Sequence, residues 1–345
     1  MDIKQLKTYI FENHKIEDIL QEIGCHSIKY HSIGNPDPYW SAANIDGNNR
    51  TAINIYNKES LKCINHTRDI RIGKNEFTDL ISLVCFNKKL ELFNGIKYIC
   101  DMLGISYYHD FDENIPESIR ITKLIYEMQQ GNIDIEEKPL KPISNQILKY
   151  YKPYVNDMFL NDGISYETQQ EFQIGYDEQS NRITIPIFSE INDLCGVKGR
   201  LFKKELEEWE QKYIYLEPCA RSKILFGLNK TYPYIMKHGE IFVGESEKFP
   251  LQLWSMGYYN SIGIGGTKVT NYQIEKLTRL GVNIIFAFDK GIEKKEIEDI
   301  ANRFVDGINI YYLYDDKNIL NDKESPSDNQ EKFEYLIKNC LYKIK

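Results

Sequence analysis

The last third of the chain alternates short apolar runs with amphipathic segments. The apolar runs are "EIFVGE", "NSIGIGG", "VNIIFAFD" and "INIYYLY", and a segment with helical periodicity follows each of them. Near-continuous apolar strands that alternate with helices are typical of a parallel sheet covered on both faces. The pattern therefore predicts an α/β domain with a parallel sheet over residues 237–345.

The first two thirds of the chain follow a different pattern. "KIEDILQEIGC" predicts a helix, "TAINIYN" and "SLKCINHT" predict antiparallel strands, and "EFTDLISLVCF" and "FNGIKYICDMLGI" predict two more helices. Acidic and proline-containing pieces then indicate a linker with one helix around Ile121–Gln129. We therefore expect an α+β and α/β multidomain protein with a small N-terminal module at 1–106, a linker at 107–145, and further domains at 146–236 and 237–345.

Composition narrows the class of protein. The 345 residues are 42% hydrophobic, which is enough for more than one buried core. We find no apolar run of membrane-spanning length and no secretory signal, so we expect a cytoplasmic protein. The seven scattered cysteines fit reduced thiols better than a disulfide framework. A net charge of -8 argues against non-specific coating of nucleic acid, although it allows a local basic groove.

Acidic residues follow successive strands of the predicted parallel sheet. Glu245 ends the first strand, Asp289 ends "VNIIFAFD", and Asp315 and Asp316 follow the next strand. Strand ends of this kind meet in one crevice, where clustered carboxylates favour a divalent cation such as Mg²⁺ or Mn²⁺. Such a site suits phosphoryl transfer on a nucleotide or polynucleotide. The alternative is that each acid only caps the helix that follows it.

The same segment resembles a TOPRIM domain, the Rossmann-like metal-binding domain of DnaG-type bacterial and phage primases. Glu245 matches the family glutamate, "GGTKVT" (265–270) matches its "LGTALT" element, and Asp289 matches the first aspartate of Asp-x-Asp. Upstream, "FLNDGISYETQQEFQIGYDEQSNRITIPIFSEINDLCGVKGRLF" and "QKYIYLEPCARSKILFGL" are similar to the primase catalytic core. The resemblance covers roughly residues 150–328, over half of the chain.

The resemblance implies roles for individual residues. It makes Glu245 and Asp289 catalytic and metal-binding, and it adds the acids of the following loop as metal ligands: Asp315, Asp316, Glu324 and Asp328. It also implies that basic residues bind template or nucleotide phosphates: Lys198, Arg200, Lys212, Arg221 and Lys223. Tyr213 and Tyr215 are available for base stacking. The alternative for the basic residues is a solvated strand and loop face.

The sequence also departs from the family at the predicted metal site. The glycine after the family glutamate is Ser246, an expected acid is replaced by Phe249, and the second aspartate of Asp-x-Asp is Gly291. Glu247 or Glu293 could substitute, but spacing does not choose between them.

The N-terminal module resembles the zinc-ribbon domain of the same primases. The second ligand pair survives as Cys63 and His66, whereas the first falls at Asn44 and Gly47. Zinc needs four good ligands, so we expect a zinc-ribbon-like module without zinc.

The main prediction is a phage-type DnaG-like DNA primase, a nucleotidyltransferase that makes short RNA primers during DNA replication. Its expected partners are single-stranded DNA, ribonucleoside triphosphates and a replicative helicase acting in trans, because we see no room for a helicase motor. It would use Mg²⁺ or Mn²⁺ and no membrane. Two alternatives remain open: a non-catalytic nucleic-acid or replisome-binding protein on a degraded primase scaffold, and a TOPRIM nuclease.

Overall fold

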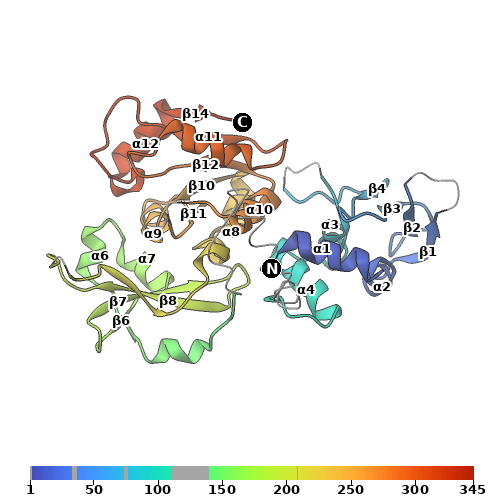
Figure 1. The fold of residues 1–345 in the computed structure, drawn as a ribbon, viewed down its shortest axis with the longest axis horizontal. Helices are drawn as coiled ribbons and strands as arrows, with labels where there is room; N and C mark the ends of the chain where they lie inside the picture. Colours follow the sequence, from blue (N-terminus) through green and yellow to red (C-terminus); the bar gives the residue numbers. More distant parts are fainter. Residues whose placement is uncertain (1, 33–36, 74–76, 110–139, 208, 267) are drawn as a thin grey trace, which may run out of the picture. The chain divides into compact units, whose positions relative to one another are not determined.

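The chain folds into two compact units, Met1–Ile135 and Glu136–Lys345 (Figure 1). The computed structural model describes residues 2–32, 37–73, 77–109, 140–207, 209–266 and 268–345. Most of the predicted linker, including the helix expected at Ile121–Gln129, lies outside the described residues. Within them, no helix is both long and apolar enough to cross a membrane.

The first unit is built around a four-stranded antiparallel sheet in the order β1-β2-β3-β4. Its strands are β1 (His26–His31), β2 (Tyr39–Ala43), β3 (Ile53–Tyr56) and β4 (Cys63–Asn65). Its helices are α1 (Ile3–Glu12), α2 (Ile16–Glu22), α3 (Leu80–Lys88) and α4 (Leu92–Met102). The antiparallel pairing confirms the predicted sheet. Helix α1 was not predicted by the sequence analysis.

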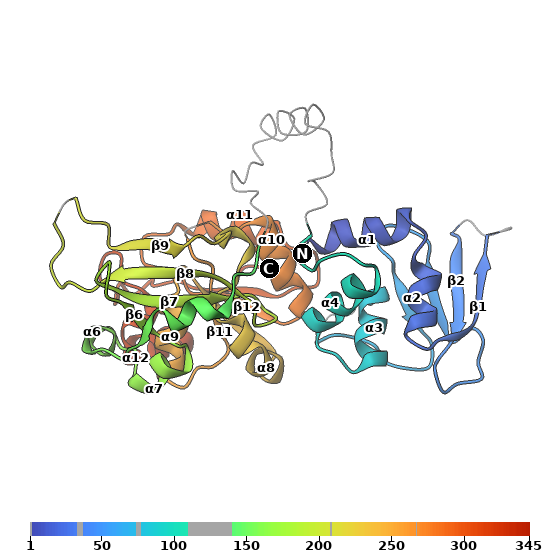
Figure 2. The same ribbon diagram turned by 90° about the horizontal axis from the view of Figure 1, so that it is seen from below.

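The second unit begins with a five-stranded antiparallel sheet in the order β5-β6-β7-β8-β9. The strands are β5 (Lys152–Pro153), β6 (Gly175–Asp177), β7 (Arg182–Phe188), β8 (Leu194–Leu201) and β9 (Tyr213–Glu217). The short helices of this part are η2 (Asn145–Lys149), α6 (Asp157–Asn161), α7 (Tyr166–Glu171) and η3 (Arg221–Lys223). Figure 2 shows β6 to β9 side by side.

The second sheet of this unit is mostly parallel, in the order β11-β10-β12-β13-β14. Its parallel strands are β10 (Glu240–Gly244), β11 (Ser261–Gly263), β12 (Asn283–Phe286) and β13 (Ile310–Leu313), and β14 (Leu341–Lys343) adds an antiparallel edge. The helices are α8 (Leu228–His238), α9 (Lys248–Ser255), α10 (Asn271–Leu280), α11 (Lys294–Asn302), η4 (Pro326–Asp328) and α12 (Gln330–Asn339). The predicted α/β alternation is confirmed, and the edge strand β14 was missed.

Helices α9 and α12 cover one face of the parallel sheet. Phe249 and Leu253 of α9 and Phe333 of α12 pack with Phe242 and Ile285 of the strands in one buried cluster. Burying aromatic side chains of this size stabilises the fold by roughly 2 to 3 kcal/mol each. This packing fixes α9 directly after β10 and so fixes the turn that carries Glu245.

Candidate active site

The carboxyl ends of β10 and β12 bring Glu245 and Asp289 together. The two strands pair in parallel, with Val243 opposite Phe286, and the two acids follow them at the same edge of the sheet. The backbone N–H of Asp289 donates a 3.1 Å hydrogen bond to Glu245 Oε1. These two predicted site residues are therefore neighbours, as expected for acids that follow adjacent parallel strands.

The two carboxyl groups of this pair resist ionisation. Burial raises the pKa of Glu245 to about 7, and the charges of Asp289 and Glu296 add to the rise. Burial also raises the pKa of Asp289, although a hydrogen bond with Ser325 opposes it. Among the residues that the structure describes, neither acid forms an ion pair with a lysine or arginine. A divalent cation would relieve this cost.

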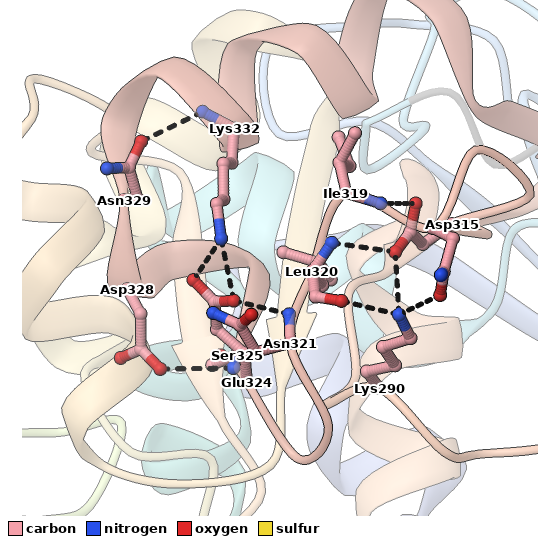
Figure 3. Close-up of polar contacts among 11 residues, drawn as sticks. Lys290, Asp315, Ile319, Leu320, Asn321, Glu324, Ser325, Asp328, Asn329 and Lys332 are labelled. Carbon is pink, nitrogen blue, oxygen red and sulfur yellow. Dashed lines mark hydrogen bonds and ion pairs between the residues drawn. The ribbon is translucent and has the colours of Figure 1, made fainter.

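The acids of the loop after β13 are arranged differently (Figure 3). Asp315 accepts hydrogen bonds from the backbone N–H groups of Ile319 (2.9 Å) and Leu320 (2.8 Å), and it lies 3.5 Å from Lys290 Nζ. Glu324 accepts from Lys332 Nζ at 2.7 Å. Both carboxylates are engaged in holding the loop.

Asp316 belongs to a third setting, at the edge strand. It accepts hydrogen bonds from Tyr342 OH at 2.9 Å and from Cys340 Sγ at 3.3 Å. Asp316 therefore contacts β14 and the residue before it, and no contact joins it to Glu245 or Asp289 in the part of the chain that the structure describes.

Asp328 is a loop acid that interacts electrostatically with the Glu245 and Asp289 pair. Its charge helps to raise the pKa of Asp289. Burial would raise the pKa of Asp328 itself, but hydrogen bonds from Lys248 Nζ (2.7 Å) and Gln252 Nε2 (3.0 Å) hold it below its ordinary value.

The donor set fits a divalent cation held by few protein ligands. No group of three or more His, Cys, Asp or Glu side chains in the described ranges is arranged to hold a metal ion. Glu245 and Asp289 do offer two hard oxygen ligands, and neither is ion-paired with a lysine or arginine in the described ranges. Mg²⁺ is commonly bound through one or two carboxylates, with water and substrate phosphates as its other ligands.

Phe249 and Gly291 stand where the family has acids, and each occupies a setting that does not suit an acid. Phe249 is 1% exposed, and its ring covers Gly244 so closely that a Cβ on the glycine would lie 2.1 Å from it. Gly291 has φ of +115°, a backbone conformation that an aspartate rarely adopts. Neither position could carry an acid in this backbone without rearrangement.

Glu247 and Glu293, the two suggested substitutes, do not join the pair. Glu247 is 4% exposed and accepts a 2.6 Å hydrogen bond from Lys198 Nζ, forming a buried ion pair. Glu293 is the N-cap residue of α11 and makes no side-chain capping bond. Glu296, in the first turn of α11, carries a charge that helps to raise the pKa of Glu245. The sequence analysis did not identify this residue. The signal that could have found Glu296 is its place in the first turn of the helix that follows β12.

Three of the predicted phosphate-binding residues lie on β8 and directly before β9: Lys198, Arg200 and Lys212. Lys198 and Arg200 lie on the same face of β8, opposite Tyr215 and Tyr213 of β9. Lys198 Nζ lies 4.9 Å from the centre of the Tyr213 ring. Burial, together with the charges of Arg200 and Lys248, lowers the pKa of Lys212. Several cations are thus gathered near the acidic edge.

Two of these cations are already paired with carboxylates. Lys198 bonds to Glu247, and Arg200 bonds to Asp162 while its guanidinium lies over the Phe159 ring. Lys212 forms no ion pair within the described part of the chain. Of the three, Lys212 has the charge most available for a phosphate.

The remaining two basic residues lie in η3. Lys223 is 7% exposed, and its ammonium lies 4.5 Å from the centre of the Tyr272 ring. Arg221 lies beside the turn at Gly265 and Gly266, within the "GGTKVT" element. Lys223 is therefore covered by Tyr272, whereas Arg221 borders the glycine turn.

In the first unit, hydrogen bonds occupy the region compared with a zinc site. Asn44 donates to Thr67 Oγ1 and accepts from Asn65, both at 2.8 Å, while the side chains of His66 and Asn54 are joined at 3.1 Å. Cys63 is fully buried, and burial raises its thiol pKa well above the ordinary value.

The chain is similar in sequence to a prophage protein and to bacterial DNA primases. No family model matches it. It is 28% identical over 231 residues to YorJ, an uncharacterized SPbeta prophage-derived protein of Bacillus subtilis, covering 59% of this chain and 61% of YorJ. It is 25% identical over 240 residues to the DNA primase of Rickettsia felis, covering 56% of this chain and 39% of that primase.

A likeness to solved structures is also found. The zinc-binding and RNA polymerase domains of the Aquifex aeolicus primase align with a TM-score of 0.49 and 16% identity, over 99% of this chain and 86% of that chain.

The chain is a distant homologue of bacterial DNA primases in its sequence. More particularly, its relatives include a prophage protein of Bacillus subtilis. The chain spans less than two thirds of the length of these two sequence relatives.

Proposed function

We propose that the chain is a phage-type primase that synthesises short RNA primers on single-stranded DNA with Mg²⁺ or Mn²⁺. In this proposal residues 146–236 form the template groove, residues 237–345 form a TOPRIM domain, and residues 1–106 form a zinc-ribbon-like module that works without zinc. A replicative helicase would act in trans.

The observation that carries the proposal is the meeting of acidic and basic groups within the second unit. Burial and the charges of Arg200 and Lys248 lower the pKa of Lys212, and Lys248 donates a hydrogen bond to Asp328. Asp328 in turn acts on Asp289, the neighbour of Glu245. A groove that binds phosphates beside a pair of metal-seeking carboxylates is what template-directed nucleotidyl transfer requires.

The residues would divide the work as follows. Glu245 and Asp289 would hold the divalent cation, which neutralises triphosphate charge and lowers the barrier to attack by the primer 3′-hydroxyl. Lys212 and Arg221 would bind phosphates of template and nucleotide, with Lys198, Arg200 and Lys223 supporting the groove. Tyr213 and Tyr215 would orient the template strand by stacking. Positioning the two reactants in this way accounts for much of the rate gain in such reactions.

A second candidate is a binding protein that has kept the primase scaffold without its activity. The core position of Phe249 and the φ of Gly291 favour this candidate, because they remove two carboxylates from the edge. The two candidates share single-stranded DNA binding and differ in metal-dependent synthesis.

Primer synthesis on a mixed-sequence single-stranded DNA separates them. The assay uses labelled ribonucleotides with Mg²⁺ or Mn²⁺ and compares wild type with Glu245→Gln, Asp289→Asn and the control Asp316→Asn. The primase proposal expects short RNA from wild type and the control, and a loss of about 100-fold or more in the first two variants. DNA binding without any product under either metal would support the scaffold.

A further inference from the structure

Trp209 lies in the loop that joins β8 to β9 (Figure 2) and is 80% exposed. The other two tryptophans are packed: the Trp40 ring centre lies 4.9 Å from that of Tyr30, and the Trp254 ring centre lies 4.7 Å from that of Tyr259. Trp209 makes no ring contact with the residues that the structure describes. Because tryptophan is highly buried on average, an indole this open to water is a candidate contact for a ligand.

Hydrogen bonds hold the loop that presents Trp209. Arg182 Nη1 donates to the carbonyl oxygen of Lys212 at 3.3 Å, where the loop enters β9. Nearer the tip, Lys203 Nζ donates a 2.9 Å hydrogen bond to Glu210 Oε2 and so joins the two arms of the loop. A ligand that contacts Trp209 therefore does not have to order the whole loop, which lowers the entropic cost of binding.

The two tyrosines predicted to stack on bases already carry a cation over their rings. Lys198 Nζ lies 4.9 Å from the centre of the Tyr213 ring and 5.9 Å from that of Tyr215. A cation at this distance is attracted to the ring face, so these rings offer less surface to a base. Trp209 has no such cation among the described residues, and it is the ring of this hairpin most open to a base.

The charge around Trp209 restricts which part of a nucleic acid can approach it. Residues 203–210 contain two lysines and four glutamates, so the tip of the loop repels phosphates. Lys212 lies three residues beyond Trp209, and three residues span at most about 11 Å. A strand whose phosphate is bound by Lys212 can therefore place a base on the indole while its backbone stays away from the glutamates.

We propose that Trp209 stacks on an unpaired base of single-stranded DNA whose phosphates are bound at Lys212. The inference rests on the proposed function, because it takes single-stranded DNA as the ligand of β8 and β9. It gives the tip of the loop a ligand class, a nucleobase of any identity, since every base offers a flat π face.

A protein partner is the competing explanation for an exposed tryptophan. A stable protein interface buries about 800 Å² on each partner, whereas one indole contributes about 250 Å² at most. Leu206, at 39% exposed, is the other large apolar side chain that the described part of this loop leaves open. Two such side chains offer enough area for one base and too little for a protein interface.

The experiment measures binding of the full chain to a thymidylate oligonucleotide, which forms no base pairs with itself. We expect Trp209→Ala to weaken binding about tenfold, through the loss of one stacked base, and Trp209→Phe to keep most of the affinity. Leu206→Ala, the matched control in the same loop, should bind as wild type does. An abasic oligonucleotide of the same length should bind wild type and Trp209→Ala equally, because it has the backbone without the bases.

Two further readouts separate stacking from a change in charge or in fold. In the double variant Trp40→Phe, Trp254→Phe the fluorescence comes from Trp209 alone, and we expect thymidylate to quench it. The salt dependence of the affinity should be the same in wild type and Trp209→Ala, whereas Lys212→Ala should lower its slope by about one. Circular dichroism checks that each variant is folded.

The outcomes separate the inference from the proposed function. Equal affinity of wild type and folded Trp209→Ala for thymidylate, or binding without quenching of Trp209, would overturn the inference, leave the primase proposal standing and favour a protein partner for the tip. A tenfold loss that also appears with the abasic oligonucleotide would overturn it, because the backbone would then be the ligand. No binding of single-stranded DNA by wild type would overturn both. If the double variant does not fold, the comparison of Trp209→Ala with Trp209→Phe decides the question.

Discussion

The strand-end pair and the loop after β13 hold their acids in opposite ways. Glu245 and Asp289 form no ion pair with a lysine or arginine among the described residues, and their pKa values are raised. In the loop, Asp315 faces Lys290, Glu324 faces Lys332 and Asp328 faces Lys248. A carboxylate that already has a lysine partner has less to gain from a metal ion than one without.

This difference sharpens the assignment of the site. The sequence analysis named six acids as metal ligands, with Glu245 and Asp289 at matching family positions and the other four in an acidic loop. Within the proposed function, Glu245 and Asp289 are the expected metal ligands, because they are half-buried and form no ion pair with a lysine or arginine among the described residues. The loop acids instead hold the loop in shape, and Asp328 links it to the strand-end pair.

The largest effect should come from forcing a further acid into the strand-end region. Phe249→Asp removes a ring from the core cluster and buries a charge, so it should lower the free energy of unfolding by about 5 kcal/mol. Urea unfolding followed by circular dichroism measures this. A stable Phe249→Asp protein with increased Mn²⁺ binding would show that position 249 can reach the site.

Glu247 tests whether closeness in sequence to Glu245 makes an acid a metal ligand. Glu247→Gln leaves Lys198 without its partner in a buried setting and should lower the free energy of unfolding by about 3 kcal/mol. Replacing both partners with methionine should restore most of the loss, which urea unfolding would detect. Unchanged stability together with weaker Mn²⁺ binding would make Glu247 a ligand after all.

The raised pKa of Glu245 predicts a pH dependence that the loop acids should not share. A metal ion must displace the proton from Glu245, so Mn²⁺ affinity should fall about tenfold per pH unit below pH 7. In the metal-free protein the sign is opposite. The stability that Glu245 contributes is fully present below pH 4.5, its ordinary pKa, and is lost as the pH rises through about 7.

Calorimetric titrations with Mn²⁺ between pH 5.5 and pH 8, chosen as roughly one unit either side of the raised pKa, measure this dependence. Glu245→Gln should remove it, whereas Glu324→Gln should keep it. An affinity that does not change with pH in wild type would contradict the account of the pair.

The smallest effect should come from breaking one of the loop's lysine pairs. Lys332→Met removes the partner of Glu324, which lies near the surface, and should lower the free energy of unfolding by about 1 kcal/mol or less. Primer synthesis should stay within about twofold of wild type. A loss of activity as large as that of Glu245→Gln would place Glu324 in the metal site.

The sequence predicted the architecture better than the site. Apolar strands such as "VNIIFAFD" determine a parallel sheet almost unaided, because burial on both faces leaves a clear pattern. The edge strand β14 was missed, since it is short and exposed. At the site, partners decide the role of each acid, and Lys198 reaches Glu247 from a strand far away in the sequence. No local pattern contains that information.

The most direct test of the account compares the two regions by Mn²⁺ binding at pH 8. Wild type, Glu245→Gln, Asp289→Asn and Asp315→Asn are titrated under the same conditions. The account predicts that Glu245→Gln and Asp289→Asn each weaken binding by about 100-fold, while Asp315→Asn binds as wild type does. Retained binding in the first two variants, with loss in Asp315→Asn, would contradict it and move the metal to the loop.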